Sequence, residues 1–253
     1  MAVVSGKPCV FAYVCTDGYT ERGAMDDFLN RLVPEKIRWV RIFPAKSKPG
    51  PKRRECDRVT GSTGSNLVSD MMERLRKYGD DPLYRNCDAI MLVDDADCRF
   101  RKSGDERTNY RVWVDDQKKR IEKTLGRTVH FFALFASPEV EAWFVADWER
   151  GFLSLYRRIG APLRIRINEL LEENGVSMDE IEKFGAYREG ACSPKLSEKI
   201  AVIIEQTGMR YSKKDDGPEL LAKIRPDAVA AHCAMYFGPT LREIERFASV
   251  YTR

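Results

Sequence analysis

Three short segments, far apart along the chain, place carboxylates where an apolar run ends. The acids are Glu21 in GYTE, Asp94, Asp95 and Asp97 in LVDDAD, and Glu139 and Glu141 in SPEVEAW. Carboxylates that gather closely repel one another and raise each other's pKa unless a cation lies between them. Oxygen ligands without histidine favour Mg²⁺, with Mn²⁺ as a close substitute. The pattern therefore predicts a divalent-metal site that can position an attacking water for chemistry on a phosphodiester.

The rest of the composition disfavours other catalytic chemistries. Histidine occurs only at His130 and His232, so histidine-based nucleophilic triads and histidine-ligated transition metals are not expected. Seven cysteines are scattered singly with no CxxC pair, which gives only weak support to a zinc site or a disulfide. Carboxylates, lysines and a hard cation remain as the groups that could carry catalysis.

The acidic segments need strands to position them, and four apolar runs supply these. Runs rich in β-branched and aromatic residues predict buried strands at 10–15, 37–43, 88–94 and 128–136. Segments with an apolar face predict a helix after each strand, at 21–32, 66–78, 108–125 and 138–147. This alternation implies an α/β fold with a mostly parallel sheet and helices on both faces. Loops at the carboxyl ends of parallel strands converge, and we expect the acids to meet there.

The second half of the sequence is predicted to be mostly helical. The expected helices are 155–174, 178–184, 194–207, 219–225 and 227–251. We therefore expect an α/β core with the metal site over 1–147 and a helical portion over 148–253 that packs on or beside the core. The pattern leaves open whether the helical portion is a separate domain.

Each acidic segment also has a simpler explanation. Glu21 at a helix start could only interact favourably with the helix dipole. The Asp94–Asp97 run could be a solvated turn, and Glu139 and Glu141 could be exposed acids in a first helical turn. Three acids over four positions at the end of an apolar strand are unusual, so the combination favours a site.

A basic loop is expected to overhang the same edge of the sheet. Its cations are Lys46, Lys48, Lys52, Arg53, Arg54 and Arg58. The loop leaves the predicted strand 37–43 at its carboxyl end, so its cations could hold phosphates while the acids hold the metal. Arg99, Arg101 and Lys102, just after Asp97, add to the expected nucleic-acid contacts. The alternative is a solvated surface loop. The GSTGS stretch at 61–65 lacks the GxxxxGK[ST] order of a P-loop.

The order of GYTE, LVDDAD and SPEVEAW resembles the TOPRIM domain of topoisomerases, bacterial primases and OLD-type nucleases. The resemblance makes Glu21 the lone glutamate after the first strand, and Asp95 and Asp97 the DxD pair after the third. Asp94 could shift this register by one. The nearest likeness is to stand-alone bacterial TOPRIM-like proteins of unknown function. It extends to EVEAWFVAD (139–147), to Pro194-Lys195 and to YSKKDDGPELL (211–221), and thus touches most of the chain.

The resemblance implies a Mg²⁺-dependent nuclease rather than a topoisomerase. Topoisomerases carry a longer acidic signature after the DxD, where this sequence continues Cys98-Arg99. In OLD-type nucleases a further carboxylate and a lysine assist the metals. Glu141, with Glu139, suits the carboxylate, and Lys195 is the first choice for the lysine, with Lys213 second. The implied catalytic residues are Glu21, Asp95, Asp97, Glu141 and Lys195, and Lys213 is also expected to contact nucleic acid.

The implied biological setting is an effector of a bacterial defence system that cleaves DNA or RNA with a partner ATPase. A non-catalytic nucleic-acid or partner-binding module on the same fold is the main alternative. A DxD-type nucleotidyl or sugar-phosphate transferase is a third, although no glycine-rich nucleotide fingerprint is present. No apolar run approaches the roughly 20 residues of a membrane span, and a cytoplasmic location is expected. The net charge of +4 does not identify a partner, and homo-oligomerisation is left open.

Overall fold

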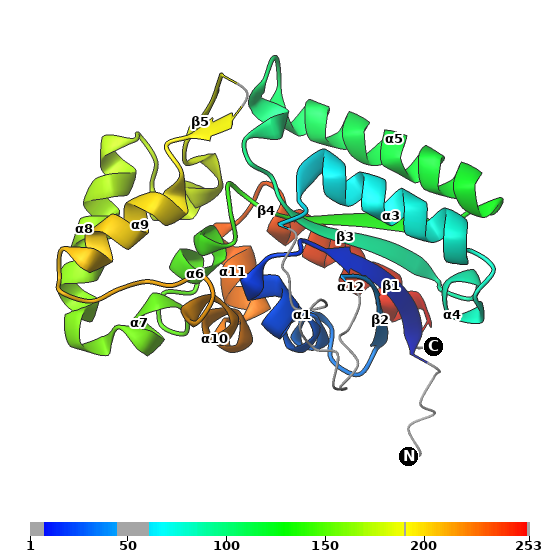
Figure 1. Cartoon of the computed structure of the whole chain (residues 1–253), viewed down its shortest axis with the longest axis horizontal. Helices are drawn as coiled ribbons and strands as arrows, with labels where there is room; N and C mark the ends of the chain where they lie inside the picture. The colour runs from blue at the N-terminus through cyan, green and yellow to red at the C-terminus, as the bar shows by residue number, and fades with distance from the viewer. Residues whose placement is uncertain (1–7, 45–60, 190, 252–253) are drawn as a thin grey trace.

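The computed structural model describes residues 8–44, 61–189 and 191–251. Its centre is a four-stranded, all-parallel sheet with the strand order β2-β1-β3-β4 (Figure 1). The strands are β1 (Cys9–Cys15), β2 (Ile37–Phe43), β3 (Ala89–Asp95) and β4 (His130–Ala136). All four predicted strands are confirmed, each within two residues at its ends. Their carboxyl ends lie along one edge of the sheet.

Helices cover both faces of the sheet, which explains why the central strands are continuous apolar runs. Every residue of β1 is buried. Its alternate side chains enter two separate cores: Ala12 and Val14 pack towards one, Phe11 and Tyr13 towards the other. The first core lies under α3 (Gly64–Tyr78) and α5 (Glu106–Leu125). The second lies under α1 (Tyr19–Leu32) and α12 (Phe237–Tyr251) (Figure 1). The α/β class with helices on both faces is thus confirmed.

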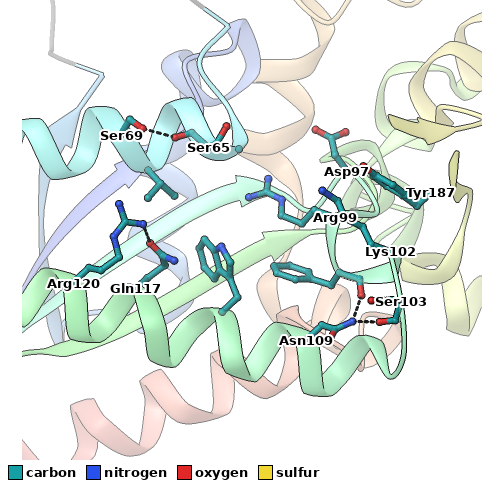
Figure 2. Close-up of a pocket in the computed structure, with 14 residues that line it drawn as sticks. Ser65, Ser69, Asp97, Arg99, Lys102, Ser103, Asn109, Gln117, Arg120 and Tyr187 are labelled. Atoms are coloured by element: carbon teal, nitrogen blue, oxygen red, sulfur yellow. Dashed lines mark hydrogen bonds between the residues drawn. The ribbon is translucent and has the colours of Figure 1, made fainter. Parts of the chain in front are cut away.

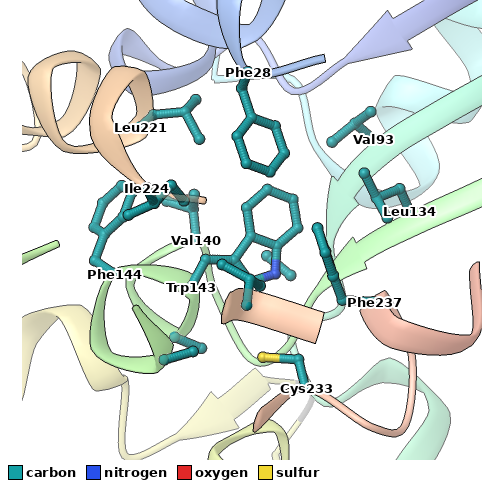
Figure 3. Close-up of a cluster of buried hydrophobic side chains, with 14 of the residues drawn as sticks. Phe28, Val93, Leu134, Val140, Trp143, Phe144, Leu221, Ile224, Cys233 and Phe237 are labelled. Atoms are coloured by element: carbon teal, nitrogen blue, oxygen red, sulfur yellow. The ribbon is translucent and has the colours of Figure 1, made fainter. Parts of the chain in front are cut away.

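The helical second half packs on the core rather than apart from it. Its longer helices are α8 (Gly160–Glu173), α9 (Leu196–Glu205), α10 (Asp216–Lys223), α11 (Pro226–His232) and α12, and the short helix α6 (Glu141–Ala146) precedes this half. The helix α10 lies against α1, and α12 lies against β4. One hydrophobic cluster contains residues from both halves of the chain. In Figure 3, Trp143 lies between Phe28 and Phe237; it stacks on the first at 5.2 Å and meets the second edge-on at 5.0 Å.

Two of the predicted helices are wrong in extent, and the reason lies outside each segment. The helix expected at 227–251 is broken, because Glu182 accepts hydrogen bonds from the backbone N–H groups of Met235, Tyr236 and Phe237. These N–H groups precede or begin α12, so a distant carboxylate starts a new helix there. The helix expected at 155–174 is interrupted after the short α7 (Phe152–Leu155), where the Tyr156 hydroxyl donates to Asp216.

A small hairpin was missed altogether. The strands β5 (Ala186–Arg188) and β6 (Ala191–Ser193) pair antiparallel in the half that was predicted to be helical. Three residues are too few for a period-two pattern to emerge from the sequence. The remaining short elements are α4 (Pro82–Arg85) and the 3₁₀ turns η1 (Arg99–Arg101), η2 (Arg157–Ile159) and η3 (Met178–Lys183). No helix in the described ranges combines the length and the apolar character needed to span a bilayer.

Candidate functional site

The predicted acids do converge at the carboxyl edge of the sheet. The charges of Glu21 and Asp97 both act on Asp95, and the charge of Glu141 acts on Glu21. Two lysines from the helical half join them. Lys213 Nζ lies 3.2 Å from Glu141 Oε1 and 3.9 Å from Glu139 Oε2, and Lys195 Nζ lies 3.9 Å from Glu139 Oε1. We call these residues the carboxylate–lysine centre: Glu21, Asp95, Asp97, Glu139, Glu141, Lys195 and Lys213.

The Glu21 carboxylate lies close to the glycine three residues before it. Gly18 occupies the position before the first turn of α1. A Cβ atom on Gly18 would lie 2.4 Å from Glu21 Oε2, so a larger residue at position 18 would require this carboxylate to shift from its present place. Glu21 is buried. Burial, together with the nearby charges of Glu141 and Asp94, raises the pKa of Glu21 to about 7 against the opposing effects of its own backbone N–H and of Lys213.

Asp94 has a structural role in this arrangement. Its Oδ1 accepts from Thr63 Oγ1 at 2.7 Å and from Thr16 Oγ1 at 3.2 Å. Its Oδ2 accepts from Gly64 N at 3.0 Å and forms an ion pair of 2.7 Å with Arg99. Both oxygens are therefore engaged in joining β3 to the start of α3. The charge of Asp94 still acts on Glu21 and Asp97, but its oxygens are engaged, which favours Asp95 and Asp97, the first of the two registers considered, as the DxD pair.

The backbone after β3 turns sharply so that Asp95 and Asp97 can face the other acids. Asp97 has a φ of 45°, in the left-handed region that few non-glycine residues adopt. Two hydrogen bonds hold this turn against the segment after β4, from Ala96 N to Ala136 O at 2.7 Å and from Asp97 N to Pro138 O at 3.0 Å. Backbone strain of this kind is characteristic of functional sites when the surrounding structure imposes it.

Burial and mutual repulsion shape the charges of the DxD pair. Burial raises the pKa of Asp95 well above its usual range, and the charges of Glu21 and Asp97 add to the effect. Burial also raises the pKa of Asp97, where Lys195 opposes the shift and Glu139 reinforces it. These carboxylates repel one another, so a cation that entered would stabilise their ionised forms.

Glu139 lies between β4 and α6, Glu141 is the first residue of α6, and both are buried. Glu139 Oε2 accepts from the backbone N of Ser197 at 3.0 Å, which ties it to the start of α9. Glu141 Oε1 accepts from the Tyr211 hydroxyl at 2.9 Å. Its other oxygen, Oε2, is buried and has no hydrogen-bond partner among the described residues. An unsatisfied buried carboxylate oxygen is costly, and it marks the place where a further cationic group would be stabilised.

Lys213 is held at the centre by contacts of its own loop. Its carbonyl accepts from Thr20 Oγ1 at 3.2 Å. Gly217 packs so closely on Thr20 that an added Cβ would lie 2.1 Å from the hydroxyl. Burial lowers the pKa of the Lys213 ammonium, but the surrounding carboxylates, led by Glu141, outweigh it and the net shift is upward. Lys213 therefore stays charged. Its contacts are closer and more numerous than those of Lys195, which was the first choice from the sequence.

The donor set fits a hard cation, although the side chains are not pre-spaced around one. No group of three or more His, Cys, Asp or Glu residues in the described ranges already has the spacing of metal ligands. The ammonium of Lys213 and the hydroxyl of Tyr211 occupy positions next to Glu141 that would otherwise be open. The unsatisfied Glu141 Oε2 and the raised pKa values of Glu21 and Asp95 are what a carboxylate site for Mg²⁺ would relieve.

Some of the predicted phosphate-binding residues lie outside the described ranges, and the arginines that the structure describes are bound within the protein. Lys46, Lys48, Lys52, Arg53, Arg54 and Arg58 lie outside the described residues. Arg99 pairs with Asp94 and donates to the carbonyls of Asp95 and Ala96.

Arg101 pairs with Glu106 at 2.9 Å and donates to the carbonyls of Phe184 and Gly185 at 3.0 and 2.8 Å. Both Arg99 and Arg101 are thus bound within the protein and fix the turn that carries Asp97.

Several features of the site carry no clear signal in the sequence. Cys98, next to Asp97, is disulfide-bonded to Cys192, which precedes Lys195 by three residues. Seven scattered cysteines without a CxxC pair provided only weak support for a disulfide, and these two are 94 residues apart. Tyr211 begins the YSKKDDGPELL segment (211–221) but was not among the predicted site residues. Its position next to Glu141 depends on how the second half folds back.

Comparison with known proteins identifies no relative. No family model matches the chain, and neither a curated protein nor a solved structure matches it.

Proposed function

We propose that the chain is a TOPRIM-type, Mg²⁺-dependent nuclease that hydrolyses phosphodiester bonds in DNA or RNA. The observation that carries the proposal is the meeting of acids from three strand ends, one of which, Glu141, has a buried oxygen without a hydrogen-bond partner among the described residues. Their position at the carboxyl edge of a parallel sheet is where α/β enzymes bind ligands. The residue order that resembles TOPRIM nucleases supports the same assignment.

The residues of the centre have distinct expected roles. Asp95, Asp97 and Glu141 would hold the ion, with Glu139 beside them. A bound Mg²⁺ supplies Lewis acidity to the phosphate and lowers the pKa of a water. Glu21, with a pKa near neutrality, is suited to accept a proton from the attacking water. Lys213 is suited to bind the negative charge of the phosphate once its carboxylate partners are taken up by the ion.

A digestion panel with paired variants tests this function. Wild type should cleave at least one of single- or double-stranded DNA or RNA in the presence of Mg²⁺ or Mn²⁺ and should be inactive in EDTA. Asp95→Asn and Glu21→Gln should each lower the rate by about 100-fold or more, because even residues that only support metal ligands cost 10–100-fold. The exposed Asp116→Asn on α5 is the matched control and should leave the rate unchanged. Equal rates for wild type and all three variants would rule out a nuclease centre.

The ion pairs of Lys213 favour one alternative, a non-catalytic nucleic-acid or partner-binding module. In that case the lysine, rather than a metal, permanently compensates the acids. Thermal denaturation distinguishes the two functions. Binding of Mg²⁺ or Mn²⁺ to the folded state should raise the melting temperature of a metalloenzyme, and a module compensated by Lys213 should show no such rise. Any ATP-driven step would require a partner ATPase, as the resemblance to OLD-type nucleases implies.

A further inference from the structure

A groove runs from the carboxylate–lysine centre between α3 and α5. It encloses about 760 Å³, which is within the range of ligand-binding pockets. Asp97 lies at the end that adjoins the centre, and Figure 2 places Arg120 and Gln117 at the other end. We call it the α3–α5 groove and define it by Ser65, Arg99, Lys102, Trp113, Arg120 and Tyr187.

The groove is positively charged although it begins at an acidic centre. Among its lining residues in the described ranges, Asp97 is the single acid, and Arg99, Lys102 and Arg120 are cations. Arg99 already pairs with Asp94. Lys102 and Arg120 are exposed, so they can contact the phosphates of a polyanion that lies along the groove.

The floor of the groove is aromatic and rigid. Trp113 is half-buried and packs edge-on against Phe100 and Phe135, with ring centroids 5.8 and 5.4 Å apart. These neighbours fix the indole, and its remaining surface lines the groove. At the end near Asp97, the ammonium of Lys102 lies 4.9 Å from the ring centre of Tyr187. Aromatic rings interleaved with cations are the usual lining of single-strand binding channels.

Amide groups lie beside the indole. Gln117 is buried, and its Oε1 accepts from Arg120 at 2.8 Å. Asn109 lies two helical turns before it, and its amide nitrogen donates to the carbonyl of Phe100 at 2.8 Å. Asn109 and Arg120 are 11 residues apart on one helix, so the groove extends about 16 Å at 1.5 Å per residue. This length exceeds that of one nucleotide unit.

We propose that the α3–α5 groove binds an unpaired strand of nucleic acid, with one base against Trp113 and phosphates beside Lys102 and Arg120. The inference rests on the proposed nuclease function and adds its substrate class. In a duplex the faces of the bases are covered by their neighbours, so only an unpaired base can lie against a recessed indole. A strand held in this way leads directly to Asp97 and the carboxylate–lysine centre.

Binding measured without cleavage tests the proposal. Fluorescence anisotropy in EDTA would compare a labelled single-stranded oligonucleotide, DNA and RNA in separate arms, with the matching duplex. Wild type should bind the single strand at least about 10-fold more tightly. Trp113→Ala should weaken single-strand binding by roughly 5- to 100-fold, the usual value of one base–aromatic stack. Trp113→Phe, which keeps a ring, should retain most of the affinity and guards against a folding defect in the alanine variant.

The charged residues provide a second, independent measurement. Lys102→Ala and Arg120→Ala should each reduce the log–log salt slope of single-strand binding by about 0.7. Lys119→Ala is the matched control, since its exposed side chain is on α5 but does not line the groove. It should leave both the affinity and the salt slope unchanged.

Three results would overturn the proposal: duplex binding as tight as single-strand binding, unchanged affinity of Trp113→Ala, or full competition by a free mononucleotide at the oligonucleotide's own concentration. Failure of the proposed function would look different. The protein would then bind single strands through the groove and digest nothing, and Asp95→Asn would bind as wild type does. If Trp113→Ala instead digested nucleic acid at the wild-type rate and bound it with the wild-type affinity, the proposal for the groove would be wrong and the proposed nuclease function would stand.

Discussion

At the residue scale, Asp94 and Asp95 are adjacent in the sequence and have opposite surroundings. Asp94 is bound by Arg99, by two threonine hydroxyls and by a backbone N–H. Burial and neighbouring acids raise the pKa of Asp95 instead. The carboxylate of Asp94 therefore contributes to folding, whereas that of Asp95 opposes folding while no cation is bound.

We expect the two asparagine variants to change stability in opposite directions. Asp94→Asn should lower the free energy of unfolding by about 2–4 kcal/mol, because the half-buried Arg99 loses its charged partner. Asp95→Asn should leave it unchanged or raise it at pH 8, because a repelling charge is removed. It should also abolish any stabilisation by Mg²⁺. Urea denaturation with and without Mg²⁺ measures both. If Asp95→Asn were the more destabilised variant, the assignment of the DxD register would be reversed.

The residue types and spacing were sufficient to predict which acids meet, because strand ends in a parallel sheet leave little freedom. The residue types and spacing were insufficient to predict which basic side chains face the acids. Arg101 stands beside the DxD pair like Lys102, yet it is turned inward to the carbonyls of Phe184 and Gly185. Lys213 was the second choice after Lys195, and its distance from Glu141 is set by a loop whose path depends on Thr20 and Gly217. Such choices depend on tertiary contacts that no local pattern encodes.

At the element scale, the strands were predictable and the breaks between helices were not. Continuous apolar runs identify parallel strands covered on both faces. The gap between α11 and α12 contains no glycine or proline at its centre that would predict a break in the helix. It is created by Glu182, which lies about fifty residues earlier and accepts from three N–H groups. The start of α12 thus depends on the carboxyl group of one buried side chain.

This dependence predicts a pH effect on stability. Burial raises the pKa of Glu182 to about 7, against the opposing effect of the three N–H groups. The folded protein therefore binds a proton more tightly than the unfolded chain, and the stability present below pH 4.5 is lost as the pH rises towards 7. Between pH 5 and 7.5 the contribution of Glu182 should fall by about 2–3 kcal/mol.

Comparison with Glu182→Gln isolates this contribution. The free energy of unfolding of the variant should depend less steeply on pH over the same interval, because glutamine does not titrate. Urea denaturation at several pH values measures the difference between the two slopes. Parallel curves for wild type and variant would mean that the N–H groups keep Glu182 ionised throughout.

At the scale of the whole molecule, the two halves share one core. Trp143 from the first half packs on Phe237 from the second, and α10 lies against α1 (Figures 1 and 3). The boundary expected after residue 147 is therefore a change in the type of secondary structure. It does not separate two hydrophobic cores.

The shared core predicts one cooperative unfolding transition. Phe237→Ala should destabilise the entire chain by about 3–5 kcal/mol, as large core truncations do. It should shift a single calorimetric peak without splitting it. Val250→Ala on the same helix is the matched control, since Val250 is 70% exposed, and it should change stability by less than about 0.5 kcal/mol. Two separate peaks, with only one moved by Phe237→Ala, would indicate independent domains.

Tyr211 follows Glu141 by 70 residues, and this separation has a consequence for the protein during its synthesis. A ribosome adding about 5–20 residues per second makes every acid of the centre several seconds before it makes Lys213. A nascent chain at that stage holds a set of carboxylates without the ammonium and phenol that later contact them. We expect the finished edge of the sheet to form only after the last third of the polypeptide has emerged, so that completion of the carboxylate–lysine centre is delayed until translation is almost complete.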